Sequence, residues 1–103
     1  MESFKFNNKT DNLFTAILSL KSIKECEAFF RDLCTIDEIK GMSERWAIVA
    51  LLDQNFPYRK IATKLKVSTT TVSRVANWFY NGLGGYRSAI DRQHHHPSFK
   101  KRR

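Results

Sequence analysis

Short polar and basic side chains gather in one segment of the chain, from residue 58 to residue 78. The hydroxyl and guanidinium groups belong to Ser68, Thr69, Thr70, Ser73 and Arg74. Four further cations precede them, Arg59, Lys60, Lys64 and Lys66. Ser and Thr hydroxyls can hydrogen-bond base edges or phosphates, a Thr methyl can touch the thymine methyl, and Lys and Arg bind phosphates. These residue types predict contact with a nucleic acid.

The apolar residues of the same segment predict how these groups are held. Ile61 and Leu65, four residues apart, have the spacing of a buried helix face, and so do Val72 and Val75, three residues apart. Ser68 lies where it can cap the second helix. We therefore predict helices near residues 57–65 and 68–80 that form a helix-turn-helix centred on residues 58–78. A plain amphipathic helix pair is the alternative.

In a helix-turn-helix the second helix lies in the major groove and the first crosses the phosphate backbone. We accordingly predict that bases are contacted by Ser68, Thr69, Thr70 and Ser73. Phosphates are contacted, in the same prediction, by Arg59, Lys60, Lys64 and Arg74. One residue departs from the usual pattern, because the turn normally holds Gly at the position of Lys66, where φ is positive. A left-handed Lys66 should cost about 1 kcal/mol.

Capping signals predict the remaining helices. Thr10 or Asp11 can cap a first helix, Ser22 and Glu25 form a capping box for a second, and Thr35 and Glu38 form one for a long third. Gly82 is predicted as the left-handed residue after the helix of residues 68–80, and a short helix follows over residues 85–92. The chain is therefore expected to be all-α, with about six helices. We expect an arm at residues 1–9, one domain at 10–92 and a basic flexible tail at 93–103.

The aromatic load of the first three helices is large for a chain of 103 residues, with Phe14, Phe29, Phe30 and Trp46 among their apolar residues. Short chains bury a small share of their surface. These residues either form a compact core or pack against a second copy, and we expect a homodimer.

The charge of the chain is divided sharply. Residues 1–57 carry seven Lys/Arg and nine Asp/Glu, whereas residues 58–103 carry eleven Lys/Arg and one Asp. A basic half favours a phosphate backbone as partner, and a generic solvated tail is the alternative. Cys26 and Cys34 fit reduced cysteines used as small apolar residues, as in a cytosol. The longest strongly apolar stretch, residues 46–52, is too short to span a membrane. The run of His94, His95 and His96 is read as a solvated tail, so we expect no metal, and no catalytic constellation is apparent.

Four stretches of the sequence resemble the Trp repressor superfamily, and within it the TrpR-like YerC/YecD family. They are residues 29–35, 44–46, 68–75 and 84–86, and the resemblance covers about residues 13–92. It implies an intertwined homodimer with two reading heads on a pseudo-palindromic double-stranded DNA operator. We interpret the protein as a regulator, a repressor and not an enzyme, that would be nucleoid-associated in a bacterial cytoplasm.

The resemblance also implies a possible effector pocket. Thr35, Arg45 and Arg74 match positions that help to bind free tryptophan in the founding member. Trp78 stands where that pocket has a Ser, so we expect Trp78 to fill part of the site and free tryptophan not to be the effector. The alternatives are an N-cap role for Thr35, an ion pair for Arg45, a phosphate contact for Arg74 and a core position for Trp78. Other functions remain open, namely a non-catalytic DNA-binding subunit of a transposase-type system and a module that binds a different protein.

Overall fold

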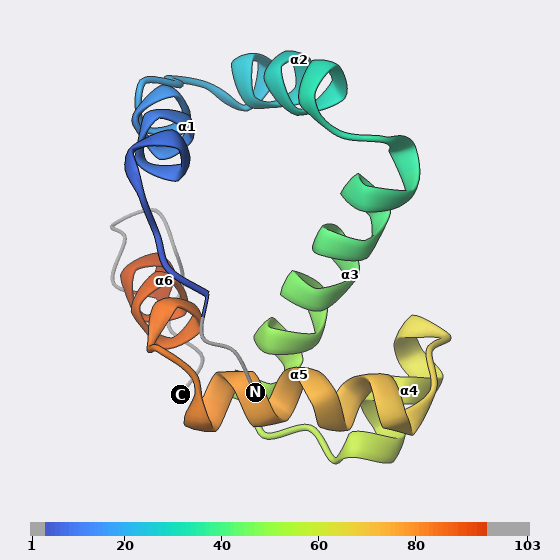
Figure 1. Cartoon of the computed structure of the whole chain (residues 1–103). Coiled ribbons are helices and arrows are strands. Elements are labelled where there is room, and N and C mark those ends of the chain that lie inside the picture. Colours follow the sequence, from blue (N-terminus) through green and yellow to red (C-terminus); the bar gives the residue numbers. More distant parts are fainter. Residues whose placement is uncertain (1–3, 95–103) are drawn as a thin grey trace. The chain divides into compact units, whose positions relative to one another are not determined.

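The computed structural model describes residues 4–94, and this part of the chain is all-α with six helices (Figure 1). They are α1 (Asn8–Leu18), α2 (Ile23–Leu33), α3 (Ile36–Asp53), α4 (Tyr58–Leu65), α5 (Thr69–Asn81) and α6 (Gly85–His94). The all-α prediction is confirmed. None of these six helices is both long and apolar enough to cross a membrane. His95, His96 and residues 100–103 lie outside the described residues, so the basic tail stays a prediction.

The chain divides into two compact units, Met1–Ile39 and Lys40–Arg103. In the first unit, α1 begins earlier than predicted, because its N-cap is Asn7, three residues before Thr10. The Asn7 Oδ1 atom accepts from the Thr10 N–H at 3.1 Å, and the Thr10 Oγ1 atom accepts from the Asn7 N–H at 2.8 Å. Thr10 is thus the third residue of the helix, and the prediction that Thr10 or Asp11 caps it is wrong.

The other two predicted caps of this unit are present. Thr35 and Glu38 form a reciprocal capping box. The Glu38 N–H donates to Thr35 Oγ1 at 3.1 Å, and the Thr35 N–H donates to Glu38 Oε1 at 2.8 Å. Ser22 caps α2 by accepting from the Glu25 N–H. The Glu25 carboxylate, however, accepts from the N–H of Lys21 instead of Ser22, so only half of that box forms as predicted.

Helices α1 and α2 bury none of their residues within the described chain. Their apolar side chains are open to solvent, with Leu18 at 84% and Ile23 at 79% exposure. Within the described residues these two helices therefore form no buried core of their own.

The second unit holds the hydrophobic core. Ten residues from four helices are buried together: Ile48, Val49, Leu52, Ile61, Ala62, Val72, Val75, Ala76, Phe79 and Ile90. They belong to the second half of α3 and to α4, α5 and α6. Burying one Ile or Val side chain of this kind stabilises a fold by roughly 1.5–3 kcal/mol. This core holds α4 and α5 in place.

Arg87 joins three of these helices. Its Nη1 atom lies 3.2 Å from Asp53 Oδ1, at the end of α3, and 3.7 Å from Asp91 Oδ1, one turn along α6. The guanidinium carbon lies 4.3 Å from the centroid of the Phe79 ring in α5. A planar cation packs well on an aromatic face, so Arg87 ties the C-terminal half of α5 to its neighbours.

The end of α5 differs from the sequence prediction. Gly82 has φ −86° and is not left-handed, whereas Gly84 has φ +90°. Gly82 is needed for a different reason: a Cβ there would lie 2.5 Å from the carbonyl oxygen of Trp78. The requirement is close backbone approach at the last turn of α5.

Replacing Gly82 with Ala should therefore destabilise the protein by about 1–3 kcal/mol, because α5 must open its last turn to admit the methyl group. Gly85→Ala is the matched control, since a Cβ at Gly85 meets no atom of the described residues within 4 Å. Urea unfolding of both variants measures the difference. Equal stability of the two would contradict the clash.

Candidate nucleic-acid interface

The turn between α4 and α5 depends on one left-handed residue. Lys66 has φ 59° and ψ 48°, as the sequence predicted. This conformation reverses the chain so that the Val67 N–H donates to the Ala62 carbonyl at 3.0 Å. Val67 packs against the core directly after the turn. The two helices are thereby joined in a helix-turn-helix.

The core then determines which side of α5 faces solvent. Val72, Val75, Ala76 and Phe79 are at most 4% exposed. Because these positions share one side of an α-helix, the other side projects outward. Over the first two turns of α5, this outward side consists of Thr69, Thr70, Ser73 and Arg74, all exposed. We call these four residues the outer face of α5. The sequence placed these four residues correctly.

Ser68, which was predicted both to cap α5 and to read a base, is the N-cap. Its hydroxyl oxygen accepts from the Thr71 N–H at 3.0 Å and lies 3.0 Å from Thr71 Oγ1. Part of its hydrogen-bonding capacity is therefore used within the protein. Its structural role is clear, and its contact with a base stays a prediction.

Asn77 extends the outer face by one turn and was missed in the sequence. It is exposed, lies four residues after Ser73, and its Oδ1 atom accepts from Asn81 Nδ2 at 3.1 Å. The signal was available, because residues four apart on a helix share a side. An Asn amide can form two hydrogen bonds with adenine in the major groove.

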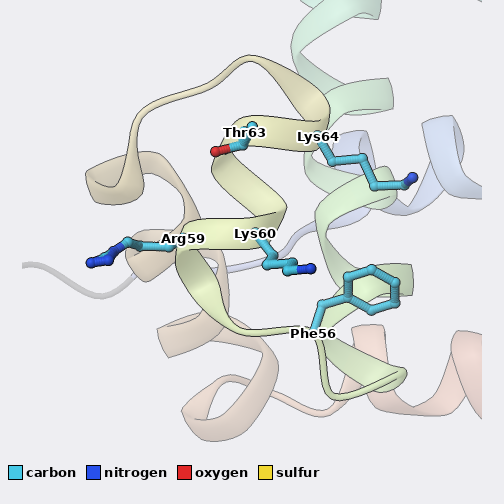
Figure 2. A pocket seen from close by; sticks show the side chains of 5 residues that line it. All are labelled: Phe56, Arg59, Lys60, Thr63 and Lys64. Carbon is cyan, nitrogen blue, oxygen red and sulfur yellow. The ribbon is translucent and has the colours of Figure 1, made fainter.

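The cations of α4 are exposed beside this helix. Phe56, Arg59, Lys60, Thr63 and Lys64 line an open depression of about 420 Å³. Figure 2 shows Lys60 and Lys64 extending to the same side as Phe56, whereas Arg59 points away from them. The basic side chains of α4 can therefore meet anionic groups at more than one position along a backbone.

The four residues of the predicted effector pocket are distributed over both units. Thr35 belongs to the first unit, where it caps α3. Arg45 and Trp78 belong to the second. Trp78 is 63% exposed, so the alternative that it is an ordinary core residue is wrong. None of these residues, Arg74 included, lines the depression on α4.

The Arg45 guanidinium lies beside Gly41, one turn earlier in α3, where a Cβ would be 3.5 Å from its Nη1 atom. The Trp78 indole lies beside Gly82, where a Cβ would be 3.3 Å from its Cε3 atom.

The fold and the α4–turn–α5 geometry define an all-α protein of the helix-turn-helix class. The model of the Trp repressor protein family matches residues 8–94, and the chain belongs to that family, whose members are DNA-binding regulators.

A relative from Bacillus subtilis, the uncharacterized protein YerC, is 44% identical over 82 residues, which are 80% of this chain and 79% of YerC. A solved TrpR-like protein from Eubacterium eligens is 37% identical with a TM-score of 0.83, over 92% of this chain and 95% of that one. A Staphylococcus aureus structure described as a candidate Trp repressor is 33% identical with a TM-score of 0.82, over 94% and 93% of the two chains.

The cap at Ser68 can be separated from the outer face by two Ser→Ala variants. Ser68→Ala should lower stability by about 1 kcal/mol, because the Thr71 N–H loses its acceptor. Ser73→Ala removes the same hydroxyl from an exposed position inside the helix, where Ala is favourable, and should not lower stability. Thermal unfolding compares the two. A larger loss at Ser73 would contradict the cap.

Proposed function

We propose that the protein is a homodimeric transcriptional regulator that binds double-stranded DNA in a sequence-specific way and represses transcription by occupying an operator. The observation that carries the proposal is the outer face of α5. It presents small hydroxyl side chains and one arginine on a helix whose opposite side is fully buried. Short side chains allow a helix to approach base edges closely.

In this proposal the residues have two roles. Bases are contacted by Ser68, Thr69, Thr70 and Ser73. Phosphates are contacted by Arg59, Lys60, Lys64 and Arg74. The exposure of all eight residues supports the assignment. The basic net charge of residues 58–103 would add salt-dependent attraction to any DNA, by release of counterions.

The homodimer is supported by the first unit. Two helices with no buried residue carry apolar side chains such as Phe14, Leu18, Ile23 and Leu33, which are 43%, 84%, 79% and 49% exposed. Because helices in proteins are stabilised mainly by packing of their apolar face, these two helices favour contact with another protein surface. A second copy of the chain presents the same surface, and the symmetric contact of a dimer would bury both.

We further propose that DNA binding needs no free tryptophan. Thr35, Arg45 and Arg74 would border the family's effector site in the dimer, and the indole of Trp78 would occupy part of it. The exposure of Trp78 in the single chain supports this assignment, since the side chain is available to fill a space that the core does not use.

Selection from a pool of random duplexes at physiological salt, without any small molecule, tests the function. We expect enrichment of one pseudo-palindromic sequence with half-sites about one helical turn apart, and sedimentation of the free protein as two chains. If enrichment appears only after tryptophan is added, the role of Trp78 is wrong. If no sequence is enriched under either condition, sequence-specific binding is wrong.

Two substitutions separate base contacts from phosphate contacts. Thr70→Ala should weaken binding to the enriched sequence by about 1 kcal/mol, through the loss of a contact at one base step. Binding to random DNA should be almost unaffected. Lys64→Ala should weaken binding to all duplexes alike. It should also reduce the salt slope, the dependence of the logarithm of affinity on the logarithm of salt concentration, by about 1. Fluorescence anisotropy at several salt concentrations measures both. Equal effects of the two variants on specific and random DNA would refute the division of roles.

A further inference from the structure

Two residues other than glycine have a positive φ in the described chain, Asn55 and Lys66. Asn55, with φ 65°, lies between α3 and α4, and Lys66, with φ 59°, lies between α4 and α5. Asn tolerates the left-handed region well because its short side chain hydrogen-bonds locally, whereas Lys has no such compensation. One of the two turns is therefore occupied by a suitable residue, and the other by an unfavourable one.

The turn itself does not require a lysine. Its stabilising contacts are the hydrogen bond from the Val67 N–H to the Ala62 carbonyl and the packing of Val67 on the core. Neither involves the Lys66 side chain, which is exposed. Within the described residues Lys66 also forms no ion pair. Among the described residues of the second unit, none accounts for a lysine at this strained position.

We propose that Lys66 contacts a DNA phosphate beside the bases that α5 reads. This contact is the reason why a lysine occupies the strained left-handed turn. The inference rests on the proposed function. Lys66 precedes the N-cap Ser68 by two residues, so its Cα lies within about 7 Å of the Ser68 Cα. When the N-terminal end of α5 enters a major groove, this turn lies near the edge of the groove.

The chemistry of lysine fits that location. Each DNA strand presents one phosphate per about 3.4 Å, so a flexible ammonium at the groove edge has an acceptor within reach. Strain of this kind persists where the residue has a functional task. The left-handed turn thus serves two purposes: it joins the helices, and it presents a cation next to the outer face of α5.

The proposal predicts that stability and DNA affinity move in opposite directions. Lys66→Gly and Lys66→Asn should both raise Tm by a few degrees, because both residues accept the left-handed region. Both should weaken DNA binding several-fold and reduce the salt slope by about 0.9, the value for one lost phosphate contact. Lys66→Arg keeps the charge and should retain the affinity and the salt slope of the original protein.

Asn55→Gly is the matched control, because it alters the other left-handed residue of the same unit. It should leave the affinity and the salt slope unchanged. The raised Tm of Lys66→Gly shows that any loss of affinity does not come from unfolding, and Lys66→Asn excludes an effect of glycine flexibility.

Anisotropy titrations and thermal unfolding of these four variants decide the question. Full affinity and an unchanged salt slope in Lys66→Gly and Lys66→Asn would overturn the inference while the proposed function stands. Failure of the unaltered protein to bind any duplex would reject the proposed function, and this inference with it.

Discussion

The buried stripe of α5 is the constraint on which the rest of the second unit depends. Val72, Val75, Ala76 and Phe79 pack into the core with residues of α3, α4 and α6. Once these side chains are buried, the rotation of α5 about its own axis is determined, and so is the set of residues that face solvent. The cap at Ser68, the turn at Lys66 and the contact of Arg87 with Phe79 then fix the two ends of the helix.

Features that arise from local interactions could be predicted from the sequence. The caps at Ser22, Thr35 and Ser68 join groups three residues apart, and the left-handed turn at Lys66 follows from its place in a short motif. The start of α1 was misplaced because residues 7–11 offer several adjacent capping side chains, and local pattern alone does not choose among them.

Features that join distant segments could not be predicted in the same way. Arg87 and Asp53 are 34 residues apart, and nothing in the sequence pairs them. The role of Gly82 depends on the distance to the Trp78 carbonyl, which is known only once the end of α5 is built. At the candidate interface the eight predicted residues were placed from helical periodicity, while Asn77 was overlooked because the predicted outer face was ended one turn too early. Which bases or phosphates they meet depends on a partner molecule.

The described core of the second unit contains apolar side chains only. Hydrogen bonds have strict directions, but apolar contacts do not, so the tilt of α5 is set by the volumes of the side chains beneath it. Adding or removing a methyl group at Val75 or Ala76 would shift this helix slightly, since a packed core responds even to changes of that size. DNA preference could therefore be altered by substitutions that never touch DNA, and the surface of α5 alone does not define its specificity.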